Sequence, residues 1–241
     1  MHGTKAIYGV GGGITWDSKW EGEYQETKQK SAVLYRQEPQ FELLTTGLIH
    51  QGELTFLEQH LTRLREASRY FAYPYNEPKL LNELQEQLVH VDPSLDYRCR
   101  IALQKNGSFQ LTITELTDLP ASYLQAQLTE QKLDLATPFT YFKTSQREHL
   151  ATKHHEQIFF LPDGSLLETT IGNLILEIKG KLYTPPAHLP LLDGIYRRHL
   201  LETQQVEEKL LTLKDLELAD RVYACNALRG LYPLDFQRKD S

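Results

Sequence analysis

The sequence predicts an α+β fold from residue 41 onward, because hairpin signals are mixed with amphipathic helical stretches. Asn106-Gly107 and Asp163-Gly164 each separate two apolar runs, as the tight turns of antiparallel hairpins do. Apolar residues at roughly helical spacing follow Leu57 as far as Phe71. These observations predict packed helices beside antiparallel strands.

The elements of the first half are expected in the following order. Residues 43–49 and 54–57 flank the short connection at 50–53, which indicates a hairpin-like pair. A helix follows over 57–71, and a second amphipathic helix fits 80–88. This half of the chain therefore begins with paired strands and continues with two helices.

The elements of the second half follow from Asn106-Gly107 onward. This turn joins strands at 100–103 and 109–114. A connector is expected near 134–138. Beyond it, the apolar runs predict strands at 157–161, 173–178 and 221–225. A helix is expected over 196–204, with Asp193 or Gly194 near its start.

Composition limits the class of protein. The chain has 241 residues, enough for one large domain or two small ones. Its net charge of -6 argues against a general nucleic-acid binder and favours small molecules or proteins as partners. Cys99 and Cys225 lie far apart without metal-ligand spacing, which suits a reducing compartment. No long uncharged apolar run occurs, so we expect a cytoplasmic protein without a membrane anchor.

Glu168 is a carboxylate in an apolar hairpin. It lies just beyond the Asp163-Gly164 turn and before the run that starts at Asn173. A rim position at the hairpin end would expose it, whereas a buried carboxylate needs a partner. No Lys or Arg lies between Phe159 and Glu177, so the partner would be a distant side chain or a cationic ligand.

Separated blocks of this half resemble the class IV pyridoxal-phosphate enzymes. These blocks are Asp163-Gly164 with Leu166, Glu168, Asn173 and Leu174, then 181–186 and 191–197. The family includes branched-chain and D-amino-acid aminotransferases and aminodeoxychorismate lyase. The resemblance implies an α+β, class IV aminotransferase-like two-domain fold with pyridoxal 5'-phosphate in the cleft between domains. A small α+β domain would span 41–135 and a larger, mainly β cofactor-binding domain 136–241, commonly as a homodimer.

Lys143 follows the apolar, strand-like run 137–142 and could be partly desolvated. Desolvation lowers a lysine pKa and leaves more of the free amine that attacks an aldehyde. Most lysines are solvated surface residues, so the residue alone favours a surface position. The segment Lys143-Thr144 with Arg147 resembles the Schiff-base segment of the family. The resemblance makes Lys143 the lysine that binds the cofactor and moves the proton.

The resemblance also implies the remaining site residues. Glu168 would accept a hydrogen bond from the pyridinium nitrogen, and Arg63 would bind the phosphate. The backbone N–H groups at the helix start, Ile195 and Tyr196, would bind an anion. Asn226 and Ala227 would lie in the last phosphate-side loop. The family often has Thr at position 196 and Ser or Thr at position 227, so hydroxyl contacts there are not implied.

Thr45, Asn173 and the histidine pair are the other polar positions of interest. Thr45, in Leu44-Thr45-Thr46, would relay a proton, although threonine in a bare strand needs no such role. Asn173 is expected to be structural. No metal is expected, because adjacent His154 and His155 point to different sides of an element.

The N-terminal segment, residues 1–40, differs from the rest. Its glycine cluster, Gly9 with 11–13, is not followed by a βαβ pattern, so a Rossmann fingerprint is weak. A polar helix fits 23–34. Together these stretches resemble the C-terminal end of chorismate-utilising enzymes such as aminodeoxychorismate synthase component I. The segment is therefore interpreted as a remnant of a synthase in a fused synthase-lyase.

The two resemblances imply a lyase that converts 4-amino-4-deoxychorismate to 4-aminobenzoate and pyruvate, a step of folate biosynthesis. The choice of lyase rests mainly on the N-terminal segment. A class IV branched-chain or D-amino-acid aminotransferase is the first alternative, and a non-catalytic domain that docks on a synthase partner is the second. A synthase or a glutamine amidotransferase would be the protein partner. Arg98, Arg100, Arg197 and Arg229 are candidate carboxylate partners that the sequence does not rank.

Overall fold

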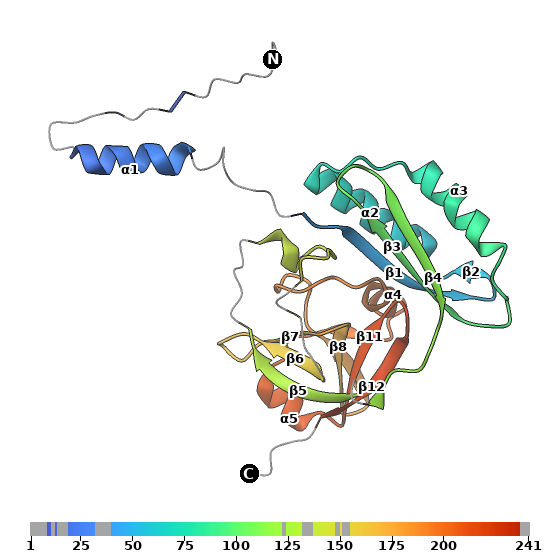
Figure 1. The fold of residues 1–241 in the computed structure, drawn as a ribbon. Helices are drawn as coiled ribbons and strands as arrows, with labels where there is room; N and C mark the ends of the chain where they lie inside the picture. Colours follow the sequence, from blue (N-terminus) through green and yellow to red (C-terminus); the bar gives the residue numbers. More distant parts are fainter. Residues whose placement is uncertain are drawn as a thin grey trace. The chain divides into compact units, whose positions relative to one another are not determined.

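The computed structural model describes residues 9–10, 13, 19–31, 40–121, 124–131, 137–147, 150 and 155–236. It divides into two units, Met1–Gln40 and Phe41–Ser241. In the first unit, the described helix α1 spans Trp20–Ser31, so it begins before the expected 23–34. Residues 32–34 lie outside the described part of the chain. Figure 1 shows the fold of both units.

The second unit begins with a four-stranded sheet in the order β2-β1-β3-β4. Its strands are β1 (Leu43–His50), β2 (Glu53–Leu54), β3 (Tyr97–Leu103) and β4 (Phe109–Glu115). All of its strand pairs are antiparallel. The Asn106-Gly107 turn joins β3 and β4 as predicted, and Gly107 has φ +83°, a conformation that favours glycine.

Helices α2 (Leu57–Phe71) and α3 (Glu77–Leu88) cover one face of this sheet (Figure 1). Burial alternates along β1, and the buried Leu43 and Ile49 pack in one core with Leu64 and Leu80 of the helices. The opposite face of β1 carries half-buried residues at even positions. That face is where the site is found.

A second sheet of eight strands follows in the order β10-β9-β8-β11-β12-β5-β6-β7, and β7 also pairs with β8. The extra pairing joins the strands from β8 to β7 into a closed ring. The strands are β5 (Gln125–Glu130), β6 (Glu156–Phe160), β7 (Leu166–Thr169), β8 (Asn173–Ile178), β9 (Lys181–Thr184), β10 (Glu207–Glu208), β11 (Arg221–Asn226) and β12 (Gly230–Phe236). Helices α4 (Ile195–Glu202) and α5 (Leu213–Leu218) complete the unit.

Most predicted elements of this half are present. The expected strands at 157–161, 173–178 and 221–225 correspond to β6, β8 and β11, and the expected helix over 196–204 is α4. Strand β5 was not predicted; it pairs in parallel with β6 and β12. The predicted domain boundary at 135 remains a prediction, and β5 lies before it yet belongs to the larger sheet.

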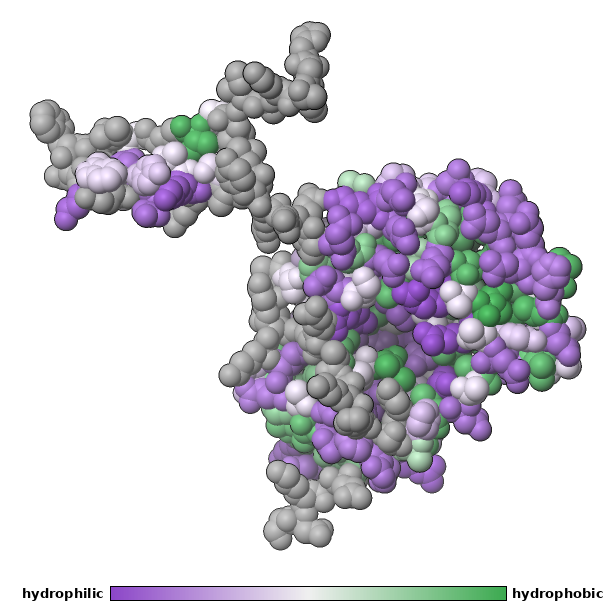
Figure 2. Space-filling model, in the orientation of Figure 1, coloured by the Kyte–Doolittle hydropathy of each residue, from purple (hydrophilic) through white to green (hydrophobic). Residues whose placement is uncertain are grey.

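Hydrophilic and apolar residues are intermixed over the visible face of the second unit (Figure 2). Among the described residues, no helix is both long and apolar enough to cross a membrane.

Candidate active site

Lys143 is carried by a short segment that is fastened to the start of β1. The backbone N–H of Leu44 donates to the carbonyl of Lys143 at 2.8 Å, and the N–H of Ser145 donates to the carbonyl of Glu42 at 2.9 Å. The preceding run is not a strand, as the sequence suggested, but a 3-10 turn over Pro138–Thr140. The proline at the start of this turn favours the turn over an extended run. The turn and the two backbone bonds fix where Lys143 enters the site.

The environment of Lys143 favours its neutral amine. Burial, followed by the charges of Arg63, Arg147 and Arg98, lowers the pKa of Lys143 to about 7, while Glu168 opposes the shift. A substantial fraction of this lysine is therefore an uncharged nucleophile at neutral pH.

Glu168, near the end of β7, finds its partner at a distance in the sequence. Arg147 Nη2 donates to its Oε1 at 3.0 Å, and the backbone N–H of Leu192 donates to the same oxygen at 3.2 Å. The Glu168 side chain is only 5% exposed, and burial raises its pKa against the opposing effect of Arg147. No described residue bonds to Oε2, so that oxygen is available to a further donor.

Arg63, on α2, is the third cation of the cavity. Its Nη2 donates to the backbone carbonyl of Asp193 at 3.0 Å. Burial, then the charges of Arg198 and Arg147, lowers the pKa of Arg63 to about 10, so the guanidinium remains charged at neutral pH. Arg63, Lys143 and Arg147 together outnumber the single carboxylate of Glu168. This local excess of positive charge suits an anionic ligand.

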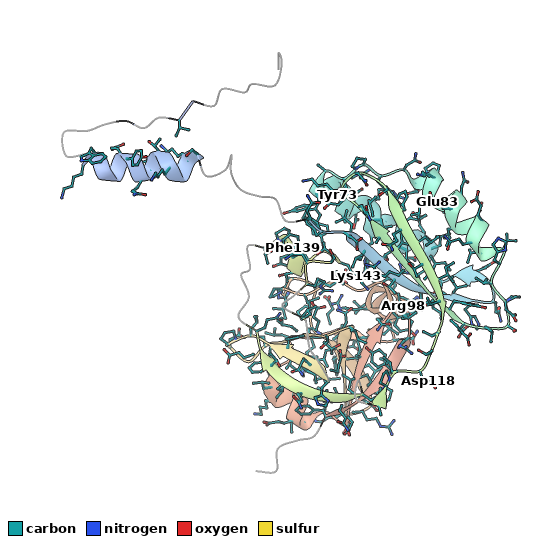
Figure 3. The ribbon with its side chains drawn as sticks, viewed as in Figure 1. Tyr73, Glu83, Arg98, Asp118, Phe139 and Lys143 are labelled. Carbon is teal, nitrogen blue, oxygen red and sulfur yellow. The ribbon has the colours of Figure 1, made fainter. Side chains whose placement is uncertain are left out.

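These groups line a cavity of about 160 Å³ between the two sheets. Six predicted site residues line it: Arg63, Lys143, Glu168, Ile195, Asn226 and Ala227. Thr45 and Tyr196 do not. Two lining residues, Thr46 and Arg147, were not assigned a role from the sequence. Figure 3 shows Lys143 in the region between the sheets.

Thr45 and Thr46 face opposite sides of β1. Thr45 is 1% exposed on the helix side, where its hydroxyl lies 2.5 Å from His60 Nδ1. Thr46 points the other way and lines the cavity. The sequence contains the signal that separates them. Side chains of a strand alternate between its faces, so Thr45 lies on the same face as the apolar Leu43 and Ile49, and Thr46 lies on the other.

Tyr196 opens α4 next to Ile195, but its side chain leaves the cavity. The Tyr196 ring lies edge-on to Phe56, with 6.0 Å between centroids. The predicted contribution of Tyr196 is thus restricted to its backbone N–H at the helix start. Gly194 precedes the helix, and a Cβ there would lie 2.0 Å from Asn173 Oδ1. The helix start is therefore packed directly against the β7–β8 hairpin.

The loop at 226–229 is held by Asn226. Its Oδ1 accepts from the backbone N–H groups of Leu228 at 3.0 Å and Arg229 at 2.9 Å. Its Nδ2 donates to the carbonyl of Ile171 at 3.2 Å. Asn226 thus lines the cavity while its side chain shapes the loop. Asn173 likewise has a structural contact, since its Nδ2 donates to the carbonyl of Leu192 at 2.7 Å.

Arg197 is a structural residue. It is 1% exposed, and its guanidinium contacts Asp193 at 2.8 Å, the carbonyl of Pro185 at 2.8 Å, and Glu208. With these partners it is not available to a substrate carboxylate, which removes it from the four candidates.

The described residues contain no group of three or more His, Cys, Asp or Glu side chains that could hold a metal ion. His154, Gly11 and Gly12 lie outside the described residues.

Comparison with known proteins identifies the family. A model described as "Amino-transferase class IV" matches residues 42–235, and the chain belongs to the class IV aminotransferase family. A model described as "chorismate binding enzyme" matches residues 1–36. Both resemblances predicted from the sequence are confirmed.

Individual relatives agree with this family. A protein of Schizosaccharomyces pombe named "Putative aminodeoxychorismate lyase" is 26% identical over 196 residues, covering 75% of this chain and 84% of the relative. The crystal structure of a "Putative amino-acid aminotransferase" from Mesorhizobium loti has a TM-score of 0.71 at 26% identity, covering 82% of this chain and 100% of that one. The 4-amino-4-deoxychorismate lyase of Pseudomonas aeruginosa has a TM-score of 0.61 at 19% identity, covering 81% and 82%. These structures confirm the predicted class IV fold.

The residues present fit pyridoxal phosphate, the cofactor of this family. Arg63 supplies charge for a phosphate group, Arg147 holds the carboxylate expected at the ring nitrogen, and the lowered pKa of Lys143 supplies an amine for an aldehyde. Glu168 Oε2 is available to a pyridinium N–H. In addition, Arg147 Nε is buried without a partner among the described residues. An anionic ligand would compensate this group of cations.

Proposed function

We propose that the chain is a 4-amino-4-deoxychorismate lyase that releases 4-aminobenzoate and pyruvate. The cavity geometry supports a pyridoxal-phosphate site, which class IV lyases and aminotransferases share. The observation that carries the choice of lyase is the chorismate-binding match of residues 1–36 in the same chain. The name of the Schizosaccharomyces pombe relative supports the same choice.

Lys143 is the group that moves the proton in this proposal. When bound, pyridoxal phosphate supplies the electron sink that makes the proton on the amine-bearing carbon acidic. The neutral amine of Lys143 removes that proton as general base. The bond from the ring carbon to the enolpyruvyl oxygen then breaks, the ring becomes aromatic, and protonation of the released enol gives pyruvate.

The other residues bind and orient. Arg63 and the start of α4 hold the phosphate, and Glu168 Oε2 receives the ring nitrogen. Arg147 keeps Glu168 in place through the 3.0 Å ion pair. Thr46, not Thr45, offers a hydroxyl on the cavity side of β1 for proton relay.

The experiment is an assay of the full chain loaded with pyridoxal phosphate. Incubation with aminodeoxychorismate should release 4-aminobenzoate and pyruvate in equal amounts, with Lys143→Ala as the inactive control. Absence of 4-aminobenzoate, together with transfer of an amino group from a branched-chain or D-amino acid to a 2-oxo acid, would identify an aminotransferase instead. The likeness to the Mesorhizobium loti structure is the observation behind that alternative.

The oligomeric and cellular setting is also a proposal. We infer a homodimer in the cytoplasm that works next to a synthase or glutamine amidotransferase partner. Light scattering of the purified chain measures its molar mass, and a monomer at assay concentration would contradict the dimer. Failure of the chain to change the absorbance spectrum of pyridoxal phosphate would favour a non-catalytic docking domain.

A further inference from the structure

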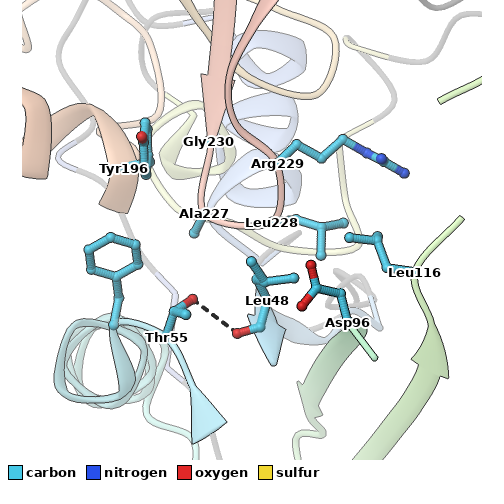
Figure 4. A pocket seen from close by; sticks show the side chains of 10 residues that line it. Leu48, Thr55, Asp96, Leu116, Tyr196, Ala227, Leu228, Arg229 and Gly230 are labelled. Carbon is cyan, nitrogen blue, oxygen red and sulfur yellow. Dashed lines mark hydrogen bonds between the residues drawn. The ribbon is translucent and has the colours of Figure 1, made fainter. Parts of the chain in front are cut away.

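A second cavity adjoins the first. It has a volume of about 380 Å³ and shares Ala227 with the smaller cavity. Figure 4 shows its walls, which include Leu48, Asp96, Leu116, Tyr196 and Arg229. Its size is within the range of small-molecule sites. A ligand held at Lys143 could therefore extend past Ala227 into this space.

The strand register places Arg98 on the sheet face that borders both cavities, although Arg98 is not among the residues that line either one. In the antiparallel pair of β1 and β3, Thr46 lies opposite Arg100 and Leu48 lies opposite Arg98. Opposite residues of such a pair project from the same face of the sheet. Thr46 lines the first cavity and Leu48 lines the second. Arg98 therefore projects from the same face of the sheet as Thr46 and Leu48, one of which lines each cavity. Figure 3 shows Arg98 and Lys143 in the region between the sheets.

The remaining candidate arginines differ in their partners. Arg100 forms an ion pair with Glu42 at 3.0 Å. Arg229 donates to the carbonyl of Thr117 at 2.7 Å. Arg98 forms no ion pair or hydrogen bond with any described residue, yet its charge contributes to lowering the pKa of Lys143. An unpaired guanidinium close to the reacting lysine is the one best placed to bind a ligand anion.

We propose, resting on the proposed function, that the second cavity receives the ring of an amine substrate that carries a ring carboxylate, and that Arg98 binds this carboxylate. The amine is held at Lys143, so a carboxylate across the ring points away from the first cavity. Planar guanidinium groups bind carboxylates through two parallel hydrogen bonds. Asp96, in the wall of the same cavity, has its Oδ1 2.7 Å from His50 Nδ1, an interaction that offsets its negative charge when the imidazole is protonated.

The test measures binding of two probes to the full chain loaded with pyridoxal phosphate. 4-Aminobenzoate carries the carboxylate, and aniline lacks it. By isothermal titration calorimetry, the wild type should bind 4-aminobenzoate more tightly than aniline. Arg98→Gln should weaken 4-aminobenzoate binding by about tenfold to a hundredfold, the range expected for a hydrogen bond to a charged group, and leave aniline binding unchanged. Arg98→Lys should retain part of the preference.

Two matched controls isolate the role of Arg98. Arg69→Gln removes an exposed arginine of α2 and should change neither affinity. Arg100→Gln should have a smaller effect than Arg98→Gln, because Arg100 is already paired with Glu42. Equal affinities of the wild type for the two probes would overturn the inference. So would an Arg98→Gln variant whose affinities for 4-aminobenzoate and aniline are both unchanged or both reduced equally. A larger loss of 4-aminobenzoate affinity in Arg100→Gln than in Arg98→Gln would overturn it as well.

The outcome separates this inference from the lyase proposal. If the wild type releases no 4-aminobenzoate from aminodeoxychorismate but Arg98→Gln still loses the preference for the carboxylate, the lyase proposal fails and the inference stands. If the wild type is an active lyase and Arg98→Gln leaves KM for aminodeoxychorismate unchanged, the inference fails and the lyase proposal stands.

Discussion

Two clusters of buried and half-buried charge meet at Asp193, and their charges are balanced in opposite ways. The Arg197 cluster has one buried guanidinium between the carboxylates of Asp193 and Glu208. The Lys143 cluster, which comprises Lys143, Arg63 and Arg147, has three cations around one carboxylate, Glu168. The backbone carbonyl of Asp193 accepts from Arg63, while its side chain pairs with Arg197.

The difference teaches which buried charges bind ligands. A buried cation without compensation destabilises a fold, whereas a cation with well-placed carboxylates and carbonyls does not need a ligand. The charge of Arg197 is balanced by two carboxylates, so this residue serves to fix the start of α4. The excess charge of the Lys143 cluster is compensated only when an anion binds. Charge balance therefore identifies the site better than the number of arginines.

Replacing Lys143 should have the largest effect. Lys143→Ala removes both the carbonyl partner and the base, so turnover should fall by roughly a thousandfold or more. The variant should remain folded, because it loses a cation from a cluster with excess positive charge. Borohydride reduction of the wild type followed by peptide mapping should place the pyridoxyl group on Lys143. Labelling of Lys132 or Lys153 instead would contradict the assignment.

Glu168→Gln should slow turnover by about a hundredfold while the cofactor stays bound, because the ring nitrogen loses the carboxylate that keeps it protonated. Steady-state kinetics and the absorbance of the bound cofactor measure the two effects separately. Unchanged kinetics would mean that another residue holds the nitrogen. Glu177→Gln, in β8, is a control for the loss of a carboxylate elsewhere on the same sheet.

Arg197→Met should affect stability more than cofactor binding, because Arg197 supports the start of α4 but does not line the cavity. The free energy of unfolding should fall by about 2 to 3 kcal/mol, which is less than for most buried ion pairs that lose one partner. The loss is smaller because Asp193 and Glu208 are 40% and 43% exposed, so water can hydrate them. Arg63→Met should instead leave the cofactor-free protein at least as stable and weaken binding of pyridoxal phosphate. Urea unfolding with and without cofactor measures both, and equal behaviour of the two variants would remove the distinction between the clusters.

The pH dependence of stability tests the burial of Lys143. In the unfolded chain this lysine binds its proton up to about pH 10, whereas in the folded protein its pKa is about 7. Between these values the unfolded state binds more protons, so the free energy of unfolding rises with pH. Without cofactor, it should rise by about 1 to 2 kcal/mol more from pH 7 to pH 9 in the wild type than in Lys143→Met. Parallel curves would show that Lys143 is solvated.

Thr46→Val and Thr45→Val should have the smallest effects. The first should change turnover and the second should change stability. Thr46→Val removes a hydroxyl from the cavity and should slow turnover by about tenfold, within the lower range of proton-transfer contributions. Thr45→Val should lower stability by about 1 kcal/mol, because it removes the partner of His60 Nδ1. A slower turnover in Thr45→Val alone would restore the assignment made from the sequence.

The sequence predicted local elements well and long-range pairing poorly. The strand expected at 173–178 is β8, Asn173–Ile178, because an uninterrupted apolar run specifies a buried strand. The pairing of Arg147 with Glu168 depends on how β7 and the Lys143 segment meet in space, and no local pattern encodes it. Strand β5 carries a weak apolar pattern and is specified by its neighbours β6 and β12.

The site residues show the same limit. Family blocks placed Lys143, Glu168 and Arg63, which line one cavity. The choice of Thr45 over Thr46 ignored strand alternation, although the apolar positions of β1 define its faces. The availability of an arginine such as Arg98 or Arg197 depends on its neighbours in three dimensions.

The contact between Gly194 and Asn173 has a consequence for anyone who would re-engineer this protein. With only 2.0 Å between a Cβ at position 194 and Asn173 Oδ1, any larger residue would push the Asn173 side chain away from its hydrogen bond to the carbonyl of Leu192. Position 194 is therefore a poor place to introduce a side chain. New substrate preferences should instead be sought in the second cavity, for example at Leu48, which lies on β1 away from this contact.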